Sequence, residues 1–407
     1  MRIKLPRSFA GLGLAVLFAV AQRPVPGLAQ GAAPSMPVFE VDSSWPKLPN
    51  NWVLGVVSSV ATDKRDHVWI FHRPRTVAEN KKSQAAPPVL EFAADGTFVR
   101  AWGGDAPGHD WPLTEHGITI DYKDNIWIGG SAVTDDFLLK FSTQGKFLKQ
   151  FGAKGQSKGN ADRTNVNRSA DTFVSPKTNE AFVADGYGNR RVIVFDAETG
   201  AFKRMWGAFG NPPDSDPPAG SGPAAGAPAS GTAGRGAAGG GAASAPVALD
   251  TEGQGSPRFG NPVHAVEISN DGLVYVADRS NRRVQVFTPD GKYVNQVFIN
   301  RAGPSNGSSA GLAFSPDPQQ QFLYVSDLGN SHVAVVNRKT LQVLYQFGAR
   351  GTKPGDFQAP HHLAVDSKGN LYTAEVNPGN RAQKFVFKGL SSTPPPNALS
   401  PAQLTSR

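Results

Sequence analysis

The 407-residue sequence contains no cysteine and only 3 methionines. The absence of cysteine excludes disulfide bonds and thiolate chemistry, so the fold must be held by core packing or by a metal ion. Long apolar runs are also missing: after residue 29 no segment approaches the roughly 20 apolar residues that a transmembrane helix needs. The sequence therefore predicts a chain without disulfides and without a membrane span.

The first 29 residues have the order of a secretory signal, which is a charged start, an apolar stretch and small residues at the cleavage site. Arg2, Lys4 and Arg7 precede an apolar run over residues 9–21, and Gly27-Leu28-Ala29 follows. Removal of residues 1–29 takes away four basic residues and no acidic one, so the formal net charge falls from +8 to +4. A charge this small argues against a nucleic-acid partner. We expect a secreted or periplasmic protein.

What the sequence does contain is 45 glycines, 33 prolines and a repeated phrase, a composition typical of turn-rich β structure. The phrase runs from an apolar strand through a "VxVAD"-like strand and "NRRVxVF" to an Asp-Gly turn and a last strand. Glycine at such turns accepts the positive φ that a tight hairpin requires. Six first strands align: "SSVATD" at Ser58, "HGITID" at His116, "ADTFVS" at Ala170, "HAVEIS" at His264, "AGLAFS" at Ala310 and "HHLAVD" at His361.

Each unit of about four strands in roughly 45–55 residues has the length of a propeller blade. The repeats resemble NHL repeats, and six of them imply an all-β fold, a six-bladed β-propeller over residues 38–390. We expect Val38–Val41 to supply the outermost strand of the last blade and to close the ring. Residues 211–256 are rich in proline, glycine, alanine and serine. They cannot bury enough apolar surface to offset their ordering entropy, which predicts a disordered insertion between blades, and residues 391–407 predict a flexible tail.

One position of the repeat alternates around the ring. Blades 2, 4 and 6 carry His116, His264 and His361, whereas the other three blades carry the small residues Ser58, Ala170 and Ala310. Inner strands line the central channel of a propeller, so the three imidazoles should meet about a common axis. Three nitrogen ligands with an open fourth position are typical of catalytic zinc. Imidazole also binds iron, copper and nickel, which the pattern indicates less strongly than zinc. Four histidines lack this symmetry and are predicted to be surface or local hydrogen-bonding residues: His67, His72, His109 and His332.

Three further polar residues should emerge on the same face, because the second strand of a blade runs back toward the entry of the first. Arg73, Tyr187 and Arg279 end the second strands of blades 1, 3 and 4. Two guanidinium groups can hold a carboxylate, and a phenol beside a metal and arginines can act as a general base. A purely structural alternative is that the arginines pair with blade-end aspartates and the tyrosine packs at the rim.

Five segments carry a closer resemblance: "VVSSVATDKRDHVWIFHR", "HGITIDYKDNIWI", "AFVADGYGNRRVIVF", "PVHAVEISNDGLVYVADRSNRRVQVF" and "FQAPHHLAVDSKGNLY". They resemble successive blades of the peptidyl-α-hydroxyglycine α-amidating lyases. The resemblance implies a zinc lyase that cleaves a carbinolamide, a peptide or small molecule bearing a carboxylate, to an amide and glyoxylate. It places the zinc ligands at His116, His264 and His361, the catalytic tyrosine at Tyr187 and the essential arginines at Arg73 and Arg279.

The sequence departs from that family at two positions. An acidic residue that serves a structural calcium follows the third zinc histidine in the family, and here it is replaced by His362, so the resemblance leaves the calcium undecided. A methionine two residues before the same histidine is replaced by Ala359. Two other functions stay open: a non-catalytic NHL propeller that binds proteins or ligands, and a zinc hydrolase that uses the same three histidines.

Overall fold

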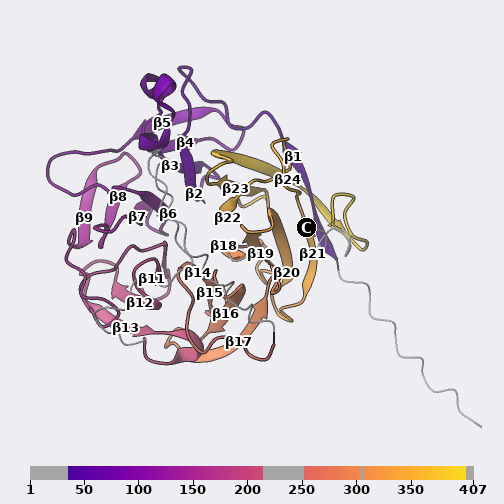
Figure 1. The fold of residues 1–407 in the computed structure, drawn as a ribbon. Coiled ribbons are helices and arrows are strands. Elements are labelled where there is room, and N and C mark those ends of the chain that lie inside the picture. Colours follow the sequence, from indigo (N-terminus) through magenta and orange to yellow (C-terminus); the bar gives the residue numbers. More distant parts are fainter. Residues whose placement is uncertain (1–34, 214–251, 304–306, 400–407) are drawn as a thin grey trace, which may run out of the picture. The chain divides into compact units, whose positions relative to one another are not determined.

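The computed structural model describes residues 35–213, 252–303 and 307–399. In these ranges the chain forms six four-stranded antiparallel sheets, arranged as blades around a common centre (Figure 1). Helical structure in the same ranges is limited to three 3₁₀ helices, η1 (Pro74–Thr76), η2 (Glu79–Gln84) and η3 (Ala208–Gly210). The prediction of a six-bladed β-propeller is confirmed. The predicted signal segment and residues 214–251 of the predicted insertion lie outside the described residues.

The strands follow one another from the inside of each blade to its outside. Blade 1 holds β2 (Val56–Thr62), β3 (Val68–Arg73), β4 (Val89–Phe92) and β5 (Phe98–Trp102). Blade 2 holds β6 (Glu115–Ile120), β7 (Asn125–Gly130), β8 (Phe137–Ser142) and β9 (Phe147–Gly152). Blade 3 holds β10 (Asp171–Val174), β11 (Glu180–Asp185), β12 (Arg191–Asp196) and β13 (Phe202–Trp206). Blade 4 holds β14 (Val263–Ile268), β15 (Val274–Asp278), β16 (Arg283–Phe287) and β17 (Tyr293–Phe298). Blade 5 holds β18 (Ser309–Phe314), β19 (Phe322–Asp327), β20 (His332–Asn337) and β21 (Val343–Phe347). Blade 6 holds β22 (Pro360–Val365), β23 (Leu371–Glu375), β24 (Arg381–Ser391) and, outermost, β1 (Met36–Asp42).

The apolar core lies between the blades. Strands such as β3 and β19 are buried at every residue, because each sheet packs face to face against the sheets on both sides. Strands buried on both faces read as nearly continuous apolar and aromatic runs, which is how "VWIFHR" and "FLYVSD" appear in the sequence. Each of the six buried clusters joins two neighbouring blades, and each inner strand contacts the inner strands on both sides.

The second arginine of the repeated "NRRV" phrase forms a buried ion pair in blades 3 and 4. In blade 3 the Nε of Arg191 donates to the Oδ2 of Asp185 at 2.8 Å, and in blade 4 Arg283 binds Asp278 at the same distance. All four side chains are fully buried. Removing one member of a buried ion pair leaves an uncompensated charge, so these pairs fix the connection between the second and third strands.

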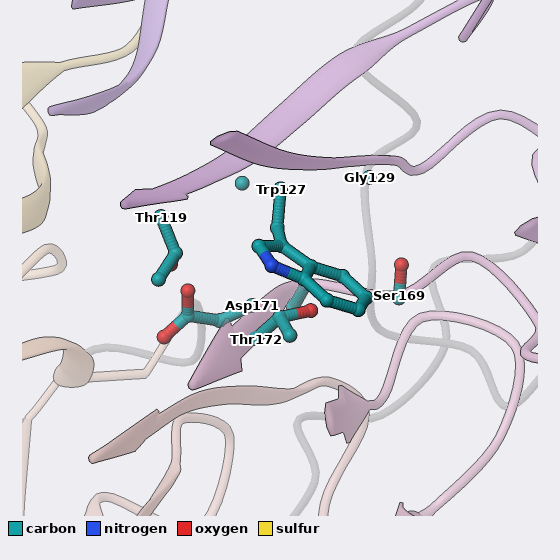
Figure 2. A pocket seen from close by; sticks show the side chains of 8 residues that line it. Thr119, Trp127, Gly129, Ser169, Asp171 and Thr172 are labelled. Carbon is teal, nitrogen blue, oxygen red and sulfur yellow. The ribbon is translucent and has the colours of Figure 1, made fainter. Parts of the chain in front are cut away.

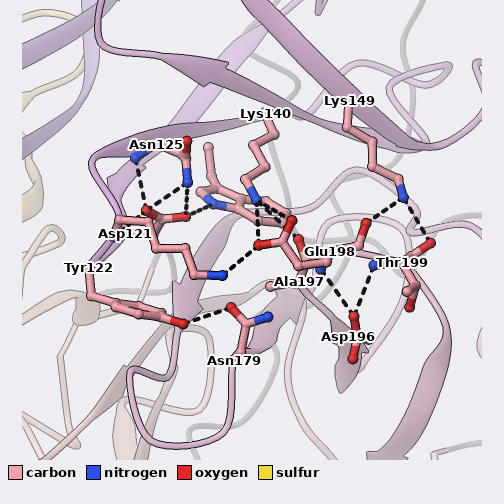
Figure 3. Close-up of polar contacts among 12 residues, drawn as sticks. Asp121, Tyr122, Asn125, Lys140, Lys149, Asn179, Asp196, Ala197, Glu198 and Thr199 are labelled. Carbon is pink, nitrogen blue, oxygen red and sulfur yellow. Dashed lines mark hydrogen bonds and ion pairs between the residues drawn. The ribbon is translucent and has the colours of Figure 1, made fainter.

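Longer side chains also link neighbouring blades. Between blades 2 and 3, the Nζ of Lys123 lies 2.6 Å from the Oε1 of Glu198, and the Nζ of Lys140 donates to the carbonyl of Ala197 at 3.2 Å (Figure 3). Exposed ion pairs of this kind contribute at most about 1 kcal/mol each. The blades are therefore held together mainly by the apolar clusters.

The ring is closed by the N-terminal strand, as predicted. β1 pairs antiparallel with β24, and the ring of Phe39 packs on Tyr324, Phe347 and Phe387. Beyond β24 the N–H of Leu399 donates to the carbonyl of Gln346, and residues 400–407 of the predicted tail lie outside the described residues. Among the described residues no helix is long and apolar enough to cross a membrane.

Candidate metal centre

Four imidazole rings meet where inner strands begin. His116 lies in β6, His264 in β14, and His361 and His362 in β22. The ring centroids of the three predicted ligands are 5.1 Å (His116 to His264), 4.9 Å (His116 to His361) and 4.4 Å (His264 to His361) apart. One nitrogen from each of the four rings lies within 4.8 Å of the others, and all four side chains are buried. The structure therefore brings together the three histidines that the repeat predicts.

Irregular pairing at the start of the inner strands turns these side chains inward. The register between the first and second strands shifts in five blades, among them between Glu115 and Ile118, between Val263 and Ala265, and between Pro360 and Leu363. A β-bulge bends the strand and re-aims the side chain that it carries.

The small residues of the alternating pattern support the histidines through their backbones. The Nδ1 of each histidine lies within hydrogen-bonding distance of a carbonyl oxygen in the next blade: His116 to Ala170 at 2.8 Å, His264 to Ala310 at 2.9 Å and His361 to Ser58 at 2.6 Å. A carbonyl oxygen can only accept, so each Nδ1 carries the proton and each Nε2 keeps its lone pair. Metal-bound histidines characteristically have their second nitrogen held in this way.

Burial keeps these rings neutral. It lowers the pKa of His116, His264 and His361 well below the usual value, and the neighbouring imidazoles lower it further. Burial, with the charge of Arg279 nearby, lowers the pKa of His362 to about 3. The neutral ring is the form that binds a metal ion.

Tyr187 lies across two of the rings. Its Oη is 2.9 Å from the Nε2 of His116 and 3.2 Å from the Nε2 of His264, and it accepts a hydrogen bond from the Nη1 of Arg279 at 3.2 Å. Both imidazole nitrogens are acceptors, whereas the phenol has one proton to give. The lone pairs of His116, His264 and His361 form a ligand set that suits a divalent cation. The side chains at this site therefore fit the metal that the repeat predicts.

The loop that carries Tyr187 needs glycine on both sides. A Cβ on Gly186 would lie 1.9 Å from the carbonyl oxygen of Val263, and a Cβ on Gly188 would lie 1.9 Å from the Oδ1 of Asn167. The backbone of this loop is thus pressed against the start of the strand that carries His264. The two glycines of the sequence "DGYGN" are what allows the loop to pack this closely.

Arg279 faces the tyrosine and not a blade-end aspartate. Its guanidinium carbon lies 5.6 Å from the centroid of the Tyr187 ring, and its Nε is buried without a hydrogen-bond partner. The aspartate before it, Asp278, is bound by Arg283. The structural alternative, in which Arg279 pairs with a blade-end aspartate, is therefore wrong.

Arg73 reaches the centre from blade 1. Its Nε donates to the carbonyl of Glu115, the residue before His116, at 2.7 Å. The side chain is almost completely buried, and burial lowers its pKa, while the nearby Tyr187 acts against this decrease. Arg73 therefore both holds the strand entry of His116 and places a positive charge beside the site.

The other histidines lie outside this cluster. The Nδ1 of His67 is 2.6 Å from the Oε1 of Glu91, within a second group of possible ligands formed with Asp63. Arg65 already binds both carboxylates there, and Arg100 also binds Glu91, so this group is a network of ion pairs. Sequence reasoning missed His362 as a nitrogen donor, although two adjacent histidines at a strand entry were a signal for it.

A small pocket lies between the inner strands of blades 2 and 3. Thr119, Trp127 and Asp171 line it (Figure 2). The Oδ2 of Asp171 accepts the N–H of Val266 from blade 4 at 3.2 Å, and burial raises the pKa of Asp171 to about 7. This carboxyl group connects inner strands of neighbouring blades.

Comparison with known proteins agrees with the blade motifs, although no family model matches the chain. The chain is 26% identical over 362 residues to "NHL repeat-containing protein 3" of Homo sapiens, covering 86% of this chain and 84% of that protein. It is 26% identical over 403 residues to "Peptidyl-alpha-hydroxyglycine alpha-amidating lyase 1" of Drosophila melanogaster, covering 90% of this chain and 63% of that protein. A solved streptogramin B lyase has a TM-score of 0.47 and 9% identity, covering 86% of this chain and 98% of that one. The predicted resemblance to NHL-repeat proteins and amidating lyases is confirmed as sequence similarity.

Proposed function

We propose that this chain is a zinc-dependent lyase that cleaves the C–N bond of a carbinolamide bearing a carboxylate, such as a peptide that ends in α-hydroxyglycine. The products are an amide and glyoxylate. The observation that carries the proposal is the position of the Tyr187 hydroxyl, which lies between two Nε2 lone pairs and a guanidinium. The similarity to a protein named as an amidating lyase supports it.

The metal would be held by the Nε2 atoms of His116, His264 and His361. Bound there, zinc supplies Lewis acidity, which makes a substrate hydroxyl more acidic. All other parts of the reaction belong to the side chains of the protein.

Tyr187 is placed to move the proton. Its Oη takes up the proton of the substrate hydroxyl and gives the phenol's own proton to the departing amide nitrogen, while the carbonyl of glyoxylate forms and the C–N bond breaks. The reaction exchanges one O–H for one N–H and needs no oxidant. Arg279 and Tyr187 are partly exposed, whereas the histidines are buried, so substrate meets the tyrosine and the arginine at the solvent side of the centre.

Arg279 and Arg73 supply the positive charge that a substrate carboxylate requires. The unpartnered Nε of Arg279 and its neighbouring Nη form a donor pair of the kind that binds carboxylates. Arg73, fixed through the Glu115 carbonyl, stabilises negative charge that develops on oxygen. The proposal also includes export of the chain after removal of residues 1–29, which would bring it to extracellular or periplasmic peptides and not to nucleic acid.

The test begins with metal content. The purified full chain should contain about one zinc, lose activity after chelation and regain it with zinc, with glyoxylate release from an α-hydroxyglycine-terminated peptide as the readout. His264→Ala should abolish both metal binding and glyoxylate release. His332→Ala is the matched control, because His332 is a buried histidine of blade 5 outside the cluster. Zinc-loaded protein that hydrolyses an ester or lactone but releases no glyoxylate would replace the lyase by a hydrolase, and a chain without metal would favour a binding scaffold.

A further inference from the structure

The fourth imidazole of the cluster has no counterpart in the three-histidine site proposed above. The His362 ring lies 4.8 Å from that of His361, 5.0 Å from that of His264 and 5.5 Å from that of His116, measured between centroids. Only 4% of the residue is exposed, and its Nε2 is buried without a hydrogen-bond partner. A buried polar nitrogen without a partner is destabilising, so the Nε2 of His362 is expected to have a ligand that fills this contact.

The backbone of β22 explains how two successive residues reach one centre. Side chains of neighbouring strand residues normally point to opposite faces of a sheet. The register of β22 shifts between Pro360 and Leu363, the interval that contains both His361 and His362. This irregularity allows both rings to face the axis.

The neighbouring blade leaves room for this arrangement. A Cβ on Gly311 of β18 would lie 2.4 Å from the carbonyl oxygen of His361 and 2.7 Å from the Cα of His362. These are backbone atoms that cannot move aside easily. Glycine at this position therefore lets the two-histidine segment pack closely against blade 5.

We infer that His362 is a fourth nitrogen ligand, so that the metal held by His116, His264 and His361 is bound by four imidazoles before substrate arrives. The inference rests on the metal site of the proposed function. Nitrogen ligands about 2 Å from zinc lie about 3.3 Å apart in a tetrahedral site. One nitrogen from each of the four rings already lies within 4.8 Å of the others, so modest side-chain movements close the set.

Coordination is measured on the full chain without any assay of turnover. The chain is loaded with zinc for X-ray absorption, which counts imidazoles around the metal, and with Co²⁺ for visible absorption, which reports coordination number. Zinc affinity is measured by competition with a chromophoric chelator. We compare the wild type with His362→Ala and with the control Ser59→Ala, which alters the equivalent position of blade 1 and removes no nitrogen.

Wild-type protein should show four imidazoles, and His362→Ala should show three, a changed Co²⁺ spectrum and zinc affinity at least about tenfold weaker. Ser59→Ala should match the wild type in all three measurements. Three imidazoles in the wild type, or an unchanged spectrum and affinity in His362→Ala, would overturn the inference. The count in the wild type decides the question even if His362→Ala does not fold. Four imidazoles without glyoxylate release would retain this inference and reject the lyase, and three imidazoles with release would do the reverse.

Discussion

At the scale of single residues, the centre is organised by which nitrogen of each histidine carries the proton. The carbonyls of Ala170, Ala310 and Ser58 fix that choice from the neighbouring blades. The alternation of histidine with small residues therefore has two physical roles. One set of blades supplies the rings, and the other supplies the carbonyls that orient them and leaves space for them.

Tyr187→Phe tests the role of the phenol. The variant retains every histidine, so it should bind as much zinc as the wild type. Loss of the proton-transferring oxygen should lower kcat by about 10²–10⁴-fold. Kinetics on an α-hydroxyglycine-terminated peptide, with metal analysis of the same preparation, provide the measurement.

Tyr122→Phe is the matched control, because Tyr122 is an exposed phenol away from the histidines. It should leave kcat unchanged. Turnover by Tyr187→Phe at the wild-type rate would remove Tyr187 from the reaction.

At the scale of strands and blades, much of the fold could be predicted because each blade repeats one short pattern. The inner-strand entries, the Asp-Gly turns and the closing strand all follow from residues that alternate or recur in fixed order. The position of His362 could not be predicted from alternation. A register shift reverses which face a residue occupies, and it arises from contacts with the neighbouring strand and with Gly311 that no local pattern records.

Asp171 provides a prediction about pH at this scale. Its pKa is about 7 in the folded chain, against an ordinary value of 3.8, because of burial. Between these values the folded chain keeps a proton that the unfolded chain has lost, so this group lowers stability as pH rises from about 4 to 7, with no further change above. Asp171→Asn cannot ionise and should escape this loss. At pH 4 the variant and the wild type should have nearly the same unfolding free energy. At pH 8 the variant should be more stable by on the order of 4 kcal/mol, if the surroundings of Asp171 do not rearrange in the wild type.

The measurement is urea denaturation of metal-free wild type and variant at pH 4, 6 and 8. Asp196→Asn is the control, because the pKa of Asp196 is shifted in the opposite direction: the backbone N–H of Thr199 lowers it to about 2 (Figure 3). Its effect on stability should stay constant over this range. An effect of Asp171→Asn that does not change between pH 4 and pH 8 would show that Asp171 titrates normally.

At the scale of the whole molecule, the metal site depends on a closed ring. The three predicted ligands come from blades 2, 4 and 6, and each inner strand contacts the inner strands on both sides. No single blade can assemble the centre. The pairing of β1 with β24 completes the sixth blade, which also carries His361 and His362, so the N-terminal strand bears indirectly on the centre.

Phe39→Ala tests this closure. Phe39 is buried on β1 against three aromatic rings, and truncation of a buried phenylalanine costs about 3–5 kcal/mol of unfolding free energy. Glu40→Ala on the same strand is the matched control, since Glu40 is exposed and its partner Lys388 is exposed too, so the change should be within about 1 kcal/mol. Urea denaturation of the zinc-loaded chain, followed by tryptophan fluorescence and by zinc release, gives both readouts. If the ring closes through β1, the fluorescence and zinc-release transitions of Phe39→Ala should coincide and shift together to lower urea. Zinc release that stays at the wild-type urea concentration would show that the centre does not need the closing strand.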